Sequence, residues 1–147
     1  MDDSLYLQVA KRFVESIPHN LDLGVEVVRV AGGVVDLRLP GRPALCGDPE
    51  RGVYFPSVLL TLADAASGVA FVSALGELTA VATLDLRIDY LRPVSVEHPL
   101  TVRANCHRHT AEVGFVSCDI RAEGADEAAA LVTASFMRRP AKTKAQA

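Results

Sequence analysis

The chain has 147 residues, of which 50% are hydrophobic and 22% are charged, and its formal net charge at pH 7 is −3. This balance predicts a globular chain with a sizeable core and excludes a disordered one. The pI of about 5.8 gives no indication of a nucleic-acid partner, which would require a basic surface.

The cysteines and the N-terminus predict a cytoplasmic location. Cys46, Cys106 and Cys118 are an odd number at unrelated spacings, which we interpret as reduced thiols. The first residues, MDDSLYLQ, lack the basic start and apolar stretch of a signal peptide. We expect no metal site, because Cys106, His107 and His109 crowd one strand and no second pair follows at zinc spacing.

The first predicted element is an amphipathic helix over residues 2–16. Leu5, Val9 and Phe13 recur every four residues, which places them on one helical face. Pro18 is expected to end this helix, because proline removes a backbone donor and clashes with the preceding turn.

Two predicted strands follow, in the segments GVEVVRV and VVDLRLP. They flank Ala31-Gly32-Gly33, and a glycine turn between two apolar runs is typical of a β-hairpin. Residues 41–54 are then predicted to form an irregular loop.

A long apolar helix is predicted from Pro56 to Leu75. Pro56 suits the first helical position and Gly76 suits the residue after the last one. Asp64 is the only charged residue between Gly52 and Gly76. The segment has the length of a membrane span, about 20 residues, but a central Asp costs about 2.5–3.5 kcal/mol on insertion. We therefore expect a core helix and no membrane partner.

Four more strands are predicted, over residues 79–91, 99–109, 113–122 and 128–138. The turns between the last strands are too short for parallel crossovers, so the sheet should be antiparallel. Together with the long helix, this order predicts an α+β fold in which an antiparallel sheet wraps around one long central helix.

The strand over residues 79–91 alternates in polarity, so its two faces can be assigned. One predicted face carries Leu84, Leu86, Ile88 and Tyr90, and the other carries Thr83, Asp85, Arg87 and Asp89.

We divide the chain into three parts. Residues 1–20 are expected to be an N-terminal helix packed on the domain, and residues 21–139 a single domain. Residues 140–147, PAKTKAQA, are polar and are expected to form a mobile tail.

Over residues 21–138 the chain resembles the hotdog-fold acyl-CoA thioesterases, in particular the phenylacetate-degradation (PaaI-like) branch. SVLLTLADAASGVA, residues 57–70, is similar to the family's central helix with its acidic residue. ATLDLRIDYLRPV, residues 82–94, is similar to the strand that ends in Tyr-x-Arg-Pro. The final pair of strands is similar as well, and the resemblance implies a hotdog fold.

The resemblance also implies a catalytic site. The family's helix carboxylate attacks the thioester or activates water, and Asp64 matches it. A hydroxyl residue on the following strand places the water, and Thr83 matches it. The family's active site lies between two subunits, so a homodimer is implied, often paired into a tetramer. Coenzyme A is part of the substrate, and no cofactor is implied.

The chain departs from the family at the start of the central helix. The family usually has His-Gly-Gly nine residues before the acid, where this chain has Phe55, Pro56 and Ser57. A backbone N–H there normally polarises the thioester carbonyl, and Pro56 has none. We therefore assign Ser57, which keeps an N–H and adds a hydroxyl, to catalysis, and Phe55 and Pro56 to substrate binding.

Each candidate also has a structural interpretation. Asp64 either is desolvated on an apolar helix, which would make it a stronger base, or points to solvent. Thr83 is a good strand former in any case, and Ser57 also suits a first helical turn. Arg92 either binds a phosphate of coenzyme A or closes a turn. Arg108 either attracts the nucleotide or lies in a solvated turn.

The leading hypothesis is an acyl-CoA thioesterase that hydrolyses a small or medium acyl-CoA. The alternative is a hotdog protein that binds acyl-CoA or another apolar ligand without hydrolysing it, because His-Gly-Gly is replaced. A hotdog dehydratase is less favoured, because it needs a histidine beside the acid and none lies between His19 and His98.

Overall fold

A computed structural model describes residues 3–139 of the chain. Its elements in chain order are α1 (Asp3–Glu15), α2 (Pro18–Leu23), β1 (Glu26–Ala31), β2 (Val34–Leu39), η1 (Pro43–Leu45), β3 (Cys46–Asp48), β4 (Val53–Tyr54), α3 (Pro56–Leu75), β5 (Val81–Tyr90), β6 (Leu100–His109), β7 (Val113–Ala122) and β8 (Ala130–Arg138).

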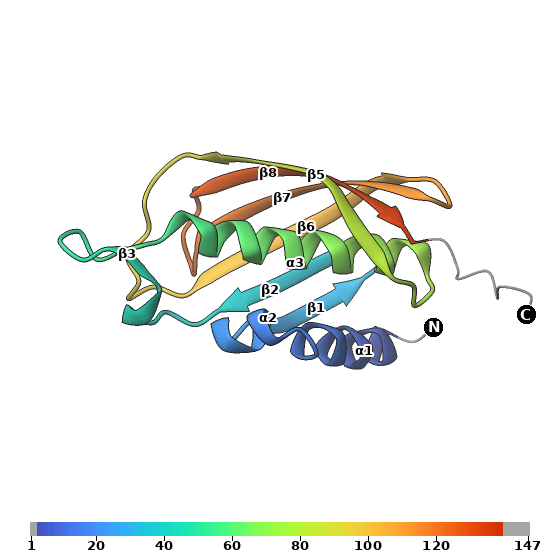
Figure 1. Cartoon of the computed structure of the whole chain (residues 1–147), viewed down its shortest axis with the longest axis horizontal. Helices are drawn as coiled ribbons and strands as arrows, with labels where there is room; N and C mark the ends of the chain where they lie inside the picture. The colour runs from blue at the N-terminus through green and yellow to red at the C-terminus, as the bar shows by residue number, and fades with distance from the viewer. Residues whose placement is uncertain (1–2, 140–147) are drawn as a thin grey trace, which may run out of the picture.

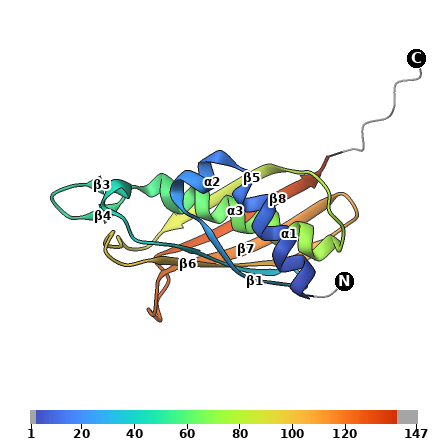
Figure 2. The same cartoon turned by 90° about the horizontal axis from the view of Figure 1, so that it is seen from below.

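The main sheet has six strands among the described residues, in the order β1-β2-β6-β7-β8-β5, and every neighbouring pair is antiparallel. It curves around α3, while α1 and α2 lie along β1 (Figure 1). Seen from below, α1 and α2 cross in front of α3, with the sheet behind it (Figure 2). The predicted α+β hotdog fold, an antiparallel sheet around one long helix, is therefore confirmed.

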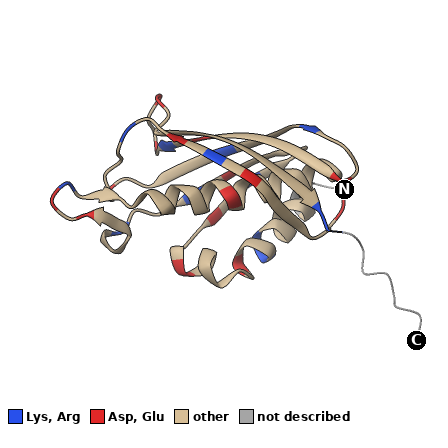
Figure 3. Ribbon diagram, turned by 45° about the horizontal axis from the view of Figure 1, so that its top comes forward, with Lys and Arg blue, Asp and Glu red and all other residues tan. Residues whose placement is uncertain are grey.

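The helix α3 has the bounds that its sequence predicts. Phe55 is extended and precedes Pro56 at the first helical position, and Gly76 ends the helix with a left-handed φ of 70°. By length and composition α3 is also able to cross a membrane, but most of it is buried beneath the sheet, as in the core helix of a globular domain. In Figure 3 α3 carries almost no charged residues, and most of the acidic and basic residues lie on other elements and loops.

Three local predictions need correction. Pro18 does not simply end the first helix but begins a second one, α2, because its fixed φ suits a first helical turn. The loop over residues 41–54 contains η1 and the β3–β4 pair, which the low apolar content of that segment concealed. The predicted mobile tail, residues 140–147, lies outside the described residues.

The third correction concerns the two faces of β5. The pairing of β5 with β8 shifts between Thr83 and Asp85, which is the signature of a β-bulge. The bulge places Thr83 against α3, and Leu86 also packs on the core, whereas Leu84 is 54% exposed. The predicted common face of Leu84 and Leu86 was wrong, because strict alternation takes no account of an extra residue.

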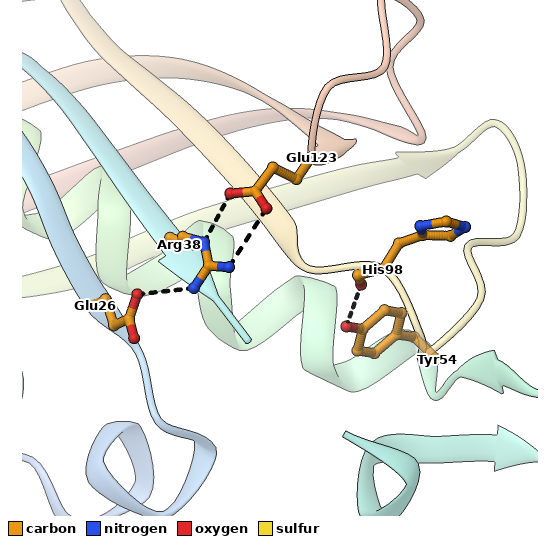
Figure 4. Close-up of polar contacts among 5 residues, drawn as sticks. All are labelled: Glu26, Arg38, Tyr54, His98 and Glu123. Carbon is orange, nitrogen blue, oxygen red and sulfur yellow. Dashed lines mark hydrogen bonds and ion pairs between the residues drawn. The ribbon is translucent and has the colours of Figure 1, made fainter. Parts of the chain in front are cut away.

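A set of polar contacts fixes the end of the sheet that leads into α3 (Figure 4). Arg38 on β2 pairs with Glu26 on β1 at 3.1 Å and with Glu123, after β7, at 2.7 Å. The buried Tyr54 donates its hydroxyl proton to the carbonyl of His98 at 2.6 Å. Because Tyr54 lies two residues before α3, this bond fixes where the helix begins.

Candidate active site

Asp64 and Thr83 are brought together by the packing of α3 on β5. The Thr83 hydroxyl donates a hydrogen bond of 2.7 Å to Oδ1 of Asp64. The bulge beside Leu84 makes this contact possible, because it turns Thr83 toward the helix. Two residues that the sequence predicts as catalytic are thus in direct contact, across 19 positions of the chain.

Asp64 faces an open cavity of about 380 Å³. Leu60, Thr61 and Ala65 line it from the same helix, and Leu86 lines it from β5. The carboxylate is exposed in the single chain, so the expected desolvation on an apolar helix is wrong for one chain alone. The reason is that apolar neighbours along a sequence do not determine which helical face the sheet covers.

His19 is a residue of this cavity that sequence reasoning missed. It lies in α2, and its Nε2 is 3.2 Å from Oγ1 of Thr61, one turn before Asp64. The 42 positions between His19 and Thr61 gave no local signal, because only the packing of α2 against α3 brings them together. His19 therefore shares a cavity with Asp64, although the sequence places no histidine near the acid.

The start of α3 forms a second cavity, of about 350 Å³. Phe55, Pro56 and Arg92 line it, as three predicted substrate-binding residues, together with Arg51 and Tyr90. The Tyr90 hydroxyl donates to the Pro56 carbonyl at 3.1 Å, and partial burial raises the pKa of Tyr90 above its ordinary value. Tyr90 therefore stays protonated at neutral pH and holds the first turn of α3 against β5.

Ser57 is exposed in this first turn but is not adjacent to Asp64. Their separation of seven positions corresponds to about 10 Å along the helix axis. One thioester carbonyl cannot contact the Ser57 N–H and the Asp64 carboxylate of the same chain at once. A site that uses both groups therefore requires a second copy of the chain.

The two predicted arginines lie in different places. Arg92 is half exposed and forms an ion pair with Glu127. Arg108 is exposed near the end of β6. Two residues before it, the Cys106 N–H donates a hydrogen bond to the Gly33 carbonyl. The Gly33 N–H in turn donates to the Ser73 hydroxyl of α3. Arg108 is thus near the C-terminal end of α3, whereas Ser57 is at its N-terminal end.

The fold of this chain is found in known proteins. Residues 51–137 match the family model described as the thioesterase superfamily. The medium/long-chain acyl-CoA thioesterase YigI of Salmonella typhimurium is 28% identical over 98 residues, which cover 58% of this chain and 63% of that protein. The alignment thus spans less than two thirds of that relative's length.

Solved structures agree with this match. A protein of Pseudomonas aeruginosa is 33% identical, with a TM-score of 0.82 over 91% of this chain and 99% of that one. The PaaI protein of the Escherichia coli phenylacetic acid degradation operon is 20% identical, with a TM-score of 0.83 over 94% of this chain and 96% of that one, and shares the fold. The chain belongs to the thioesterase superfamily and has the hotdog fold.

Proposed function

We propose that the protein hydrolyses the thioester of a small or medium acyl-CoA, with Asp64 as the general base or the nucleophile. The observation that carries this proposal is the bond from Thr83 to Oδ1 of Asp64, on a carboxylate that faces an open cavity. The bond orients the carboxylate and leaves Oδ2 for a water molecule or for the thioester carbon.

Two routes are open to this carboxylate. As a base, Oδ2 accepts a proton from water, the hydroxide adds to the carbonyl, and the coenzyme A thiolate leaves and regains a proton. As a nucleophile, Oδ2 adds to the carbonyl, and an anhydride forms as the thiolate leaves; water then hydrolyses it. Both routes develop negative charge on the carbonyl oxygen and need a donor there.

We propose that a second copy of the chain supplies this donor through the Ser57 N–H. The outer edge of β5 has no strand partner among the described residues, and an unpaired edge is a template for pairing with another chain. Leu84, on this strand, is 54% exposed. Pairing of two β5 strands would form a homodimer and bring the start of one α3 toward the other chain. Association of two dimers into a tetramer remains a prediction.

The two arginines of the second cavity suit the phosphates of coenzyme A. Arg92 and Arg51 both line the cavity at the start of α3, and guanidinium groups bind phosphate through paired N–H donors. Arg108 remains a candidate for the nucleotide end. The cytoplasmic location and the lack of a cofactor also remain predictions.

A complementation experiment tests the proposed site. Asp64→Asn and Ser57→Pro each remove one group, and proline is tolerated in a first helical turn. We expect each variant alone to be nearly inactive on a panel of acyl-CoAs. When the two are unfolded and refolded together, a shared site predicts recovery of about a quarter of the wild-type activity, because half of the dimers are mixed and each holds one intact site. No recovery would contradict the shared site, and no hydrolysis by the wild type would contradict the thioesterase proposal.

One observation favours the alternative of a binding protein without turnover. Pro56 occupies the first helical position, where it supplies no N–H, and Phe55 beside it is 52% exposed. Under this alternative, calorimetry would detect binding of a non-hydrolysable S-alkyl-CoA, while the corresponding acyl-CoA would remain intact.

A further inference from the structure

A separate cavity of about 430 Å³ lies beneath α1. Val9 and Phe13 of α1 form one wall, and Val69 and Val72 of the C-terminal half of α3 form the opposite wall. Aliphatic and aromatic side chains dominate the lining, so the cavity suits an apolar ligand.

The polar groups of this cavity do not suit a charged ligand head group. Arg12 is the one charged residue among the described residues that line it, and its side chain is exposed. The buried Ser73 hydroxyl accepts a hydrogen bond of 3.2 Å from the Gly33 N–H. Since burial of an unpaired polar group is costly, the interior favours a hydrocarbon chain.

The cavity continues the one that contains Asp64. Ile17 and Ala65 line the Asp64 cavity, whereas Phe13 and Val69 line the cavity beneath α1. Ala65 and Val69 are four residues apart on α3, which is one helical turn, so the two cavities follow one another along this face of α3. Phe13 near the end of α1 and Ile17 just before α2 are likewise four residues apart in the chain. Both cavities therefore belong to the cleft between α3 and the segment formed by α1 and α2.

The distance along this cleft sets a chain length. Asp64 and Val72 are eight residues apart, which corresponds to about 12 Å along the helix. An extended chain gains about 1.2 Å per bond, judged from the reach of an extended polypeptide. A chain that begins at Asp64 therefore reaches Val72 after about ten bonds.

We infer that the cavity beneath α1 binds the distal part of the acyl chain whose thioester lies at Asp64, so that α1 selects chains of about ten carbons. This inference rests on the proposed function and names its substrate class. Each methylene that leaves water adds about three- to fourfold to affinity. Longer chains should therefore bind more tightly until the cavity is full.

The experiment measures binding and hydrolysis separately. Calorimetry with S-hexyl-CoA and S-dodecyl-CoA reports chain-length preference without any turnover. Val72→Trp fills the cavity from α3, and Val9→Trp fills it from α1. Val28→Trp on β1 is the matched control, because Val28 is 57% exposed and outside the cavity.

We expect the wild type and Val28→Trp to bind S-dodecyl-CoA at least about thirtyfold more tightly than S-hexyl-CoA. Both cavity variants should lose at least about tenfold in affinity for S-dodecyl-CoA and retain their affinity for S-hexyl-CoA. Equal binding of the two compounds by the wild type would overturn the inference. Unchanged affinity of both cavity variants for S-dodecyl-CoA would also overturn the inference, provided that circular dichroism shows the variants to be folded.

The two proposals fail in different ways. A wild type that hydrolyses acyl-CoA without chain-length preference would retain the thioesterase proposal and reject the cavity. A wild type that binds S-dodecyl-CoA with the expected preference and hydrolyses no acyl-CoA would retain the cavity and reject the thioesterase proposal.

Discussion

The two halves of α3 differ in what surrounds them. From Pro56 to Ala65 the helix repeatedly presents exposed side chains, including Ser57, Leu60 and Asp64, whereas residues 66–71 are all buried. Residues 66–71 are thus covered by their neighbours, whereas one face of the first half is open. This difference teaches that one helix supplies both the core and the candidate site, and it predicts that substitutions in the two halves affect different properties.

The largest expected effect is on activity, from Asp64→Asn in the open half. Loss of a general base typically costs about 10²–10⁴-fold in rate, so we expect kcat for acyl-CoA hydrolysis to fall by that range. Because Asp64 is exposed, the unfolding free energy should change by less than about 0.5 kcal/mol. Steady-state hydrolysis assays and urea unfolding measure the two quantities.

Asp85→Asn is the matched control, since Asp85 is an exposed carboxylate on β5, two residues from Thr83. It should retain wild-type kcat. An Asp64→Asn variant with wild-type activity would show that the open half of α3 is not catalytic.

The second largest effect is on stability, where the buried half of α3 meets the sheet. A Cβ atom at Gly114 on β7 would lie 2.2 Å from Cδ2 of the fully buried Phe71. Gly114→Ala should therefore destabilise the fold by about 1–3 kcal/mol, the usual cost of overpacking a core. The midpoint of urea unfolding measures this loss.

Gly68→Ala provides the control inside α3. A Cβ atom there would meet Cε1 of Phe136 at 3.5 Å, an ordinary contact, and alanine is favoured over glycine in a helix interior by about 0.8–1.0 kcal/mol. We expect unchanged or increased stability. Equal losses from both substitutions would contradict the close packing of Phe71 on Gly114.

A third effect depends on pH and also belongs to the buried half. Burial raises the pKa of the Cys118 thiol from 9.0 to about 11, and its sulfur lies 3.6 Å from the Ser67 hydroxyl of α3. Because the folded state holds this proton more tightly, the stabilisation is present below pH 9 and is lost as the pH rises toward 11. The loss should approach about 2–3 kcal/mol. Urea unfolding at several pH values should give a steeper decline for the wild type than for Cys118→Ala, and identical declines would refute the assignment.

The sequence predicts those features of the fold that depend on neighbouring residues. Pro56 and Gly76 bound α3 because each acts on the backbone beside it, and the polar turns bound β7 in the same way. The second helix was missed because Pro18 both follows α1 and begins α2, and the sequence shows no difference between a proline that ends a helix and one that starts the next.

The candidate site was predictable only in part, because its contacts cross the chain. Asp64 and Thr83 were found through the family resemblance and are in contact. The bulge at Leu84, the exposure of Asp64 and the position of His19 arise from how α2, α3 and β5 pack together. Periodicity assigns a residue to one face of its own element, but it does not tell which neighbour covers that face.

The smallest expected effect links the two elements of the site through one hydrogen bond. Thr83→Val removes the hydroxyl that bonds Oδ1 of Asp64 at 2.7 Å and keeps the shape of the side chain. The carboxylate would remain charged but would lose its fixed orientation, so we expect about a tenfold loss of kcat with little change in KM. Thr83→Ser retains the hydroxyl and should stay within about threefold of the wild type. Equal rates for Thr83→Val and Thr83→Ser would show that Thr83 serves only as a strand former. The orientation of Asp64 would then be set by α3 alone.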